Sequence, residues 1–208
     1  MPAIRAALFD FGGVLSSSPF DRFARYETER GLPGGFLRRV NAVDPDTNAW
    51  ARLERSEIDV DEFRRLYAEE SRAAGHEVDG LELLALLGGE LRPAMVDAVR
   101  RCKEHLRTGL LTNNVVGPMA DADDRLRTVL PLFDVVVESS KVGVRKPDPR
   151  FYELACEALD VAPEEAVFLD DLGVNLKPAR AMGMTTIKVD DPDRAIEELE
   201  SVVGFALR

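Results

Sequence analysis

The chain has 208 residues, of which 45% are hydrophobic and 31% charged, and its formal net charge is −11. This composition is typical of a globular protein, and the length allows one or two domains around a sizeable core. The acidic balance argues against a protein that binds nucleic acid or anionic membranes, because both ligands select clustered lysine and arginine. An anionic substrate would need positive groups concentrated in its pocket, or a metal ion.

The cysteines and the N-terminal segment favour a cytoplasmic protein. Cys102 and Cys156 lie in helical patterns and not in a C-x-x-C pair, so we expect two buried thiols rather than a zinc site or a disulfide framework. The first residues show no basic segment followed by an apolar run, and no apolar stretch approaches the ~18 residues needed to cross a bilayer. The sequence specifies no oligomeric state.

Five short hydrophobic runs predict strands, and several are apolar throughout, as in parallel strands covered on both faces. They span residues 4–9, 106–111, 135–138, 166–169 and 185–189. Apolar residues at helical spacing predict helices between the later strands, over residues 93–106, 148–159 and 175–182. This alternation predicts an α/β fold with a doubly wound parallel sheet.

The first predicted strand ends in an acidic residue and a glycine turn, Asp10 followed by Phe11, Gly12 and Gly13. Ligands of open α/β sheets sit just outside the carboxyl ends of the strands, and paired glycines leave the backbone open to a ligand. A carboxylate buried there costs free energy. Asp10 is therefore the first candidate for chemistry, and a purely structural turn is the alternative.

Residues 17–90 interrupt the alternation of strands and helices. They contain five helical patterns, over residues 20–29, 35–43, 50–55, 60–74 and 81–87. Because this insertion follows the first strand, we expect it to lie over the strand ends, as a cap that closes the pocket and excludes water. Residues 1–16 and 91–208 would then form the catalytic core. A structural satellite without a role in the chemistry is the alternative.

Two polar clusters follow the next two strands. Thr112 and Asn113 bring a hydroxyl, an amide and backbone N–H groups that can hold phosphoryl or carboxylate oxygens, although a turn rich in Asn is the alternative. Lys146 precedes a segment stiffened by Pro147 and Pro149, which would hold its charge in place near an anionic substrate. A solvated surface position is the usual alternative for a lysine.

The fourth strand ends in Asp170 and Asp171. Adjacent carboxylates repel each other unless a positive charge lies beside them. Mg²⁺ is suited to this place, because it is a hard cation that takes one or two carboxylates together with substrate phosphate. Asn175 follows, and it would either cap the next helix or reach the outer shell of the metal.

Together these clusters resemble the four motifs of the haloacid dehalogenase-like hydrolase superfamily, in the same order. The motifs are Asp10-Phe11-Gly12-Gly13-Val14, Thr112-Asn113, Lys146-Pro147-Asp148-Pro149 and Asp170-Asp171 with Asn175. The run 168–177, with residues 138–140 upstream, is similar to the phosphatase-like domain of soluble epoxide hydrolases and the related domain of acyl-CoA dehydrogenase fusion proteins. The resemblance implies a Rossmann-like core with a helical cap and a Mg²⁺-dependent hydrolase.

The resemblance also assigns roles in catalysis and substrate binding. Asp10 would be the nucleophile, and Lys146 would neutralise charge around Asp10 and the phosphoryl oxygens. Thr112 and Asn113 would bind the phosphoryl group of a small phosphorylated molecule. The Gly12-Gly13 turn would contribute to the same substrate site.

For the metal, the resemblance assigns Asp10 and Asp171 as the main carboxylate ligands of Mg²⁺. Asp170 is a weaker candidate, and the backbone carbonyl of Gly12 is a possible third ligand.

One departure from the family pattern changes the expected chemistry. Phosphatases of this superfamily usually carry a second Asp two residues after the nucleophile, as general acid and base, where this chain has Gly12. Such catalysis is worth about 10²–10⁴ in rate. We therefore expect a phosphatase that forms an aspartyl-phosphate and favours good leaving groups. The alternatives are a metal-independent 2-haloacid dehalogenase and a non-catalytic domain that binds a ligand or a partner.

Other residues that chemistry often uses receive structural interpretations. His76 and His105 are expected in structural or surface positions, and the acidic run 121–124 on a solvated helix face. Trp50, together with Phe63 and Tyr67, either lines the substrate side of the cap or forms its hydrophobic core.

Overall fold

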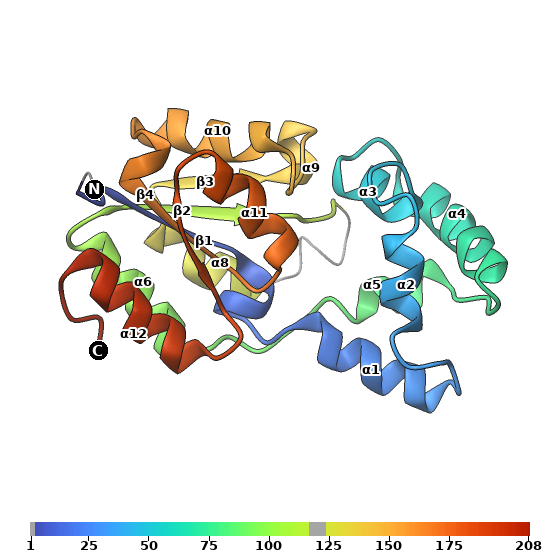
Figure 1. Cartoon of the computed structure of the whole chain (residues 1–208). Helices are drawn as coiled ribbons and strands as arrows, with labels where there is room; N and C mark the ends of the chain where they lie inside the picture. Colours follow the sequence, from blue (N-terminus) through green and yellow to red (C-terminus); the bar gives the residue numbers. More distant parts are fainter. Residues whose placement is uncertain (1–2, 117–123) are drawn as a thin grey trace.

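The computed structural model describes residues 3–116 and 124–208, and within them five strands form one parallel sheet. The sheet order is β3-β2-β1-β4-β5 (Figure 1). The strands are β1 (Ala6–Phe9), β2 (Arg107–Thr112), β3 (Val135–Glu138), β4 (Ala166–Asp170) and β5 (Thr185–Lys188). Every predicted strand is present, with its ends at most two residues from the predicted ones, and the predicted doubly wound α/β fold is confirmed.

Helices cover both faces of this sheet (Figure 1). One face carries α10 (Pro149–Leu159) and α11 (Gly173–Ala181), and the other carries α6 (Pro93–Lys103) and α12 (Pro192–Val203). Successive residues of β1 alternate between the two hydrophobic clusters and are fully buried. This explains why the strand is apolar throughout, since neither of its faces meets solvent.

Some elements differ from the prediction. The short helices α8 (Asp124–Val129) and α9 (Ser139–Val142), and the longer α12, are additional. The helix predicted over 175–182 begins earlier, at Gly173, so Asn175 lies inside α11 and does not cap it. The acidic residues 121–123 lie outside the described residues.

Five helices between β1 and α6 form a separate body, which we call the helical insertion (Figure 1). They are α1 (Pro19–Glu29), α2 (Phe36–Ala42), α3 (Ala49–Glu54), α4 (Val60–Ala73) and α5 (Gly80–Ala85). Side-chain oxygens of Ser18, Asn48, Asp59 and Asp79 cap four of them by accepting backbone N–H groups of the first turn. The boundaries at 17 and 90 stay a prediction.

The helical insertion has a hydrophobic cluster of its own. Phe63 and Tyr67 are fully buried in it, and Trp50 packs at its edge, partly buried. The two aromatic residues of α4 are therefore part of its core rather than the lining of a pocket. Each is held by ring contacts, since Phe63 lies 5.8 Å from the Trp50 ring and 5.4 Å from the Tyr67 ring.

The two chain crossings between the core and the helical insertion run side by side. Ser16 and Leu91 form an antiparallel bridge. On either side of it, the Ser17 N–H donates to the Glu90 carbonyl and the Arg92 N–H donates to the Leu15 carbonyl, both at 2.8 Å. The tether is therefore a short paired ribbon.

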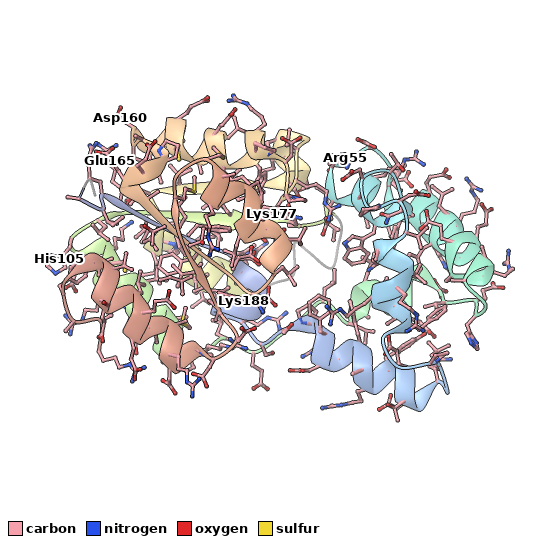
Figure 2. All side chains as sticks on the ribbon, in the orientation of Figure 1. Arg55, His105, Asp160, Glu165, Lys177 and Lys188 are labelled. Atoms are coloured by element: carbon pink, nitrogen blue, oxygen red, sulfur yellow. The ribbon has the colours of Figure 1, made fainter. Side chains whose placement is uncertain are left out.

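The remaining residues singled out from the sequence lie away from the strand ends. Cys102 and Cys156 are buried free thiols, as predicted. His76 stacks edge-on against Phe36, and His105 is exposed at the outer end of the core (Figure 2). In residues 3–116 and 124–208, each helix is too short or too polar to cross a membrane.

Candidate active site

Carboxylates from two neighbouring strands meet at the carboxyl edge of the sheet. Asp10 follows β1, Asp170 ends β4 and Asp171 follows it, and one oxygen atom from each lies within 4.8 Å of the others. The strand order reverses between β1 and β4, which is where open α/β sheets bind ligands. A hydrogen bond of 2.9 Å from the Asp10 N–H to the Leu169 carbonyl joins the two strand ends.

Lys146 lies between two of these carboxylates and is only 1% exposed. Its Nζ is 2.8 Å from Asp10 Oδ1 and 2.7 Å from Asp170 Oδ2. Burial lowers the pKa of Lys146, but Asp10 and Asp170 outweigh burial and raise it above its ordinary value. The side chain is therefore a buried cation, and not the solvated lysine of the alternative interpretation.

Asp170 is fully buried and its carboxylate is already occupied by donors. Besides Lys146, the Asn175 Nδ2 lies 3.0 Å from both of its oxygens, and the Leu172 N–H donates to Oδ1 at 2.8 Å. Asn175 thus binds a carboxylate from inside α11, a role that the sequence analysis did not assign. A direct metal bond to Asp170 would have to displace these donors.

Asp10 and Asp171 are the carboxylates with oxygen atoms to spare. Asp171 is partly exposed and accepts a long hydrogen bond of 3.4 Å from the Ser18 hydroxyl. Burial and the negative charge of Asp170 raise its pKa to about 6. Burial also raises the pKa of Asp10 to about 7, although Lys146 opposes this shift. Two carboxylates that repel each other in this way fit a small divalent cation with oxygen ligands.

Gly12 and Gly13 differ in their backbone angles and in the space left for a side chain. Gly13 has φ +77°, and a Cβ there would lie 2.2 Å from Asp171 Oδ2, so only glycine fits. Its carbonyl accepts a hydrogen bond of 2.8 Å from Arg92 Nη1. Gly12 has φ −72° and ψ 128°, and a Cβ there would meet only Pro19 Cδ at 3.9 Å. The position of the absent second Asp is therefore sterically open.

Thr112 and Asn113 follow the neighbouring strand, β2. Thr112 is its last residue and is buried. The Asn113 side chain contacts the backbone of Lys146 twice, since its Oδ1 accepts from the N–H at 2.9 Å and its Nδ2 donates to the carbonyl at 3.1 Å. In this structure the amide holds the lysine loop, and the predicted phosphoryl contacts of both residues stay predictions.

Sequence reasoning missed the contribution of the helical insertion to this site. Glu54, at the end of α3, is 6% exposed, and its Oε2 lies 2.6 Å from Arg145 Nε and 3.4 Å from Asn113 Nδ2. Arg145 directly precedes Lys146. No local pattern marks Glu54, because its partners in the core lie far along the chain and meet it only in the folded protein.

Comparison with known proteins shows the family of the chain. Residues 4–183 match the family of haloacid dehalogenase-like hydrolases. The chain is 34% identical over 203 residues to the protein "Phosphatase MT3486" of Mycobacterium tuberculosis, covering 90% of the chain and 88% of that protein.

Two mammalian relatives are much longer than this chain. Identity is 37% over 212 residues with mouse acyl-CoA dehydrogenase family member 10, and 35% over 221 residues with pig bifunctional epoxide hydrolase 2. These matches take in 98% and 99% of the chain but only 19% and 40% of the relatives. The chain therefore corresponds to one part of each.

The fold also recurs in solved structures. One is an enzyme of the same family from Bacteroides thetaiotaomicron, in complex with magnesium and inorganic phosphate. It superimposes with a TM-score of 0.58 at 19% identity, covering 89% of this chain and 94% of that one. At this identity the likeness concerns the fold.

Proposed function

Because the chain belongs to the haloacid dehalogenase-like hydrolases, we propose that it is a Mg²⁺-dependent phosphatase acting on small phosphate monoesters, with Asp10 as the nucleophile. The observation that carries this proposal is the buried contact of Asp10 with Lys146, beside the partly exposed Asp171. Several relatives are named as phosphatases, which favours phosphate esters over other substrates of the family.

The proposed reaction has two displacements at phosphorus. An Asp10 carboxylate oxygen attacks the phosphorus atom, the new O–P bond forms as the ester P–O bond breaks, and the alcohol leaves with a proton from solvent. Water then attacks the phosphorus of the aspartyl-phosphate, gives up a proton, and releases inorganic phosphate together with the Asp10 carboxylate. Dividing one hard step into two easier ones is the advantage of a covalent intermediate.

Charge repulsion is the main obstacle to the first displacement. Two like unit charges ~4 Å apart repel by ~4 kcal/mol at an effective dielectric constant of ~20. The buried ammonium of Lys146 lies 2.8 Å from Asp10 and would offset part of this. Mg²⁺ held by Asp10, Asp171 and the carbonyl of Gly12 would supply further positive charge, in keeping with the electrostatic character of phosphoryl transfer.

Gly12 sets the expected substrate preference. Because Gly12 has no side chain, this position lacks the general acid that would protonate the departing oxygen. Aryl phosphates, acyl phosphates and sugar 1-phosphates, whose leaving groups need little protonation, should therefore react faster than simple alkyl phosphates.

The helical insertion, residues 17–90, would act as the cap over this site. Its helix α3 lies against α9, and Glu54 reaches two residues that neighbour Lys146. In this position it would exclude water from the aspartyl-phosphate until the leaving group has departed.

A phosphate-release assay tests the proposal. The purified chain is assayed on aryl, acyl, alkyl and sugar phosphates with Mg²⁺ or with EDTA, beside the Asp10→Asn variant. We expect release that requires Mg²⁺, and a loss of roughly 10⁴–10⁶-fold in the variant. Beryllium fluoride should occupy Asp10 in the wild type only.

The same assay separates the two alternatives. Chloride release from chloroacetate in EDTA would identify a dehalogenase. A folded protein that binds Mg²⁺ but hydrolyses none of the esters and never takes up beryllium fluoride would instead be a binding domain.

A further inference from the structure

The α3 end of the helical insertion rests on the loop that carries Lys146. The Ser56 hydroxyl donates to the Ser140 carbonyl at 2.9 Å, and Arg145 Nη1 donates to the Pro45 carbonyl at the same distance. Between these contacts, Glu54 pairs with Arg145. Arg55, at this edge of the insertion, marks the place in Figure 2. The insertion therefore contacts the residues that lead directly into the buried lysine.

Glu54 is held from three sides at this contact. Trp50 Nε1 donates to its Oε1 at 2.9 Å, while Arg145 Nε and Asn113 Nδ2 approach its Oε2 at 2.6 and 3.4 Å. One partner belongs to the helical insertion and two belong to the core. Burial raises the pKa of this carboxyl group, and Arg145 opposes the shift.

Both core partners of Glu54 are attached to Lys146. Arg145 is the preceding residue in the chain, and the Asn113 side chain bonds to the N–H and the carbonyl of Lys146 at 2.9 and 3.1 Å. Within the described part of the chain, Glu54 forms no hydrogen bond or ion pair with Asp10 or Asp170. Its influence on the reacting groups would thus pass through the backbone of the lysine.

A buried ion pair gives little net stability, because removing two charges from water offsets most of their attraction. An ion pair at a contact between the helical insertion and the core can instead fix the relative positions of the groups that it joins. A shift of about 1 Å would break the contacts of Lys146 Nζ with Asp10 and Asp170, and misplacements of that size cost roughly a hundredfold in rate.

We propose that Glu54 is a positioning residue: when the helical insertion is seated, Glu54 fixes Arg145 and Asn113 and so keeps the Lys146 ammonium between Asp10 and Asp170. The part of this inference that concerns turnover rests on the proposed phosphatase activity. The mechanical part, that Glu54 restrains residues 139–148, stands without it.

The first test compares Glu54→Gln with Glu69→Gln. The amide keeps the size of Glu54 and removes its charge, while Glu69 is an exposed residue of α4 that pairs with Arg65 at 2.8 Å, away from the core. Hydrogen exchange over residues 139–148 is followed by mass spectrometry without substrate, and kcat and KM are measured separately. We expect faster exchange and a roughly ten- to hundredfold lower kcat with a smaller change in KM for Glu54→Gln, and no change for the control.

A second variant separates positioning from stability. In Glu54→Gln/Arg145→Gln no unpaired charge stays buried, so Tm should return toward the wild-type value. Positioning predicts that kcat stays low and that exchange over 139–148 stays fast. Recovery of both Tm and kcat in the double variant would overturn the proposal, as would wild-type exchange and kcat in Glu54→Gln.

Failure of this inference is distinguishable from failure of the proposed function. If the wild type releases no phosphate from any ester, the phosphatase proposal fails, and the exchange measurement still decides whether Glu54 restrains the lysine loop. If the wild type is active and Glu54→Gln matches it in kcat and exchange, only the positioning role is lost.

Discussion

Buried charges have different roles at the strand ends of the core and at the contact surface of the helical insertion. At the strand ends they join groups within the core, and at the contact surface they join the insertion to the core. At the carboxyl edge of the sheet, Lys146 joins Asp10 and Asp170, which stand at the ends of two paired strands, β1 and β4. At the insertion, Glu54 joins two bodies that have separate hydrophobic clusters. Under the two proposals, the sheet would determine which groups react, and the helical insertion would determine how accurately they are held.

The largest expected effect comes from removing the cation at the strand ends. Lys146→Met leaves Asp10 and Asp170 buried without a counter-charge, so we expect a loss of about 3–5 kcal/mol in the free energy of unfolding. Phosphatase activity should fall roughly 10²–10³-fold. Urea unfolding at pH 7 and steady-state kinetics measure the two effects. A variant as stable as the wild type would mean that the two carboxylates share protons instead.

The raised pKa values predict how the metal-free protein responds to pH. In the folded protein, burial raises the pKa of Asp10 to about 7 and that of Asp171 to about 6, from the ordinary value of 3.8 for an aspartate. Between pH 4 and pH 7 the folded state therefore binds more protons than the unfolded chain does. The free energy of unfolding consequently falls as pH rises through this window. At about 1.4 kcal/mol per pKa unit, the Asp171 shift alone corresponds to a loss on the order of 3 kcal/mol in the free energy of unfolding.

Urea unfolding in EDTA at several pH values checks this trend. The Asp10→Asn variant is the control, because it should flatten the slope. Mg²⁺ should stabilise the wild type more at pH 8 than at pH 5, since it competes with protons for the same oxygens. A stability that rises with pH across the whole window in the absence of metal would contradict the assignment.

A matched pair of alanine substitutions compares the two glycines. Gly13→Ala must accommodate a positive φ and displace Asp171, and we expect a loss of about 1–3 kcal/mol together with weaker Mg²⁺ binding by calorimetry. The free energy of unfolding of Gly12→Ala should stay within about 0.5 kcal/mol of the wild-type value. Equal effects at the two positions would show that the loop rearranges freely.

Restoring a carboxylate at the open position sharpens the expected substrate preference. Gly12→Asp places an acid next to the nucleophile, where the backbone angles are ordinary and Pro19 is the nearest neighbour at 3.9 Å. We expect hydrolysis of alkyl phosphates to rise at least about tenfold, with little change for aryl phosphates. Equal losses on both substrate classes would indicate that the added charge only repels the substrate.

The smallest effect should come from the exposed contact beside Glu54. Ser56→Ala removes one hydrogen bond to the Ser140 carbonyl. We expect the free energy of unfolding to fall by less than about 1 kcal/mol, and kcat to change by less than about threefold. A larger change in kcat than in Glu54→Gln would move the positioning role from the ion pair to this hydrogen bond.

Much of the core could be predicted from the sequence because its signals are local. A run such as Ala6–Phe9 is apolar throughout because both faces of the sheet are covered. A polar residue that follows such a run, as Asp10 does, must lie at the carboxyl end of the strand. The resemblance to the family, now supported by the match over 4–183, rests on those same positions.

What the sequence could not provide are the contacts between distant segments. Asn175 was expected at a helix end or near the metal, but it binds Asp170, and its place inside α11 depends on where that helix begins. Glu54 and Arg92 carry no motif, and their roles emerge only when the helical insertion and the glycine turn are folded against the core.

If the helical insertion is the proposed cap, its paired tether would limit how it can move over the site. Two independent linkers would let the insertion swivel in any direction, whereas the ribbon formed by Ser16 and Leu91 bends far more readily across its plane than within it. Opening and closing should therefore be a hinge motion of the helical insertion about one axis. Each closure would return the same edge of α3 to the same contact with α9 and Arg145. Substrates of different size would then enter the site in the same orientation.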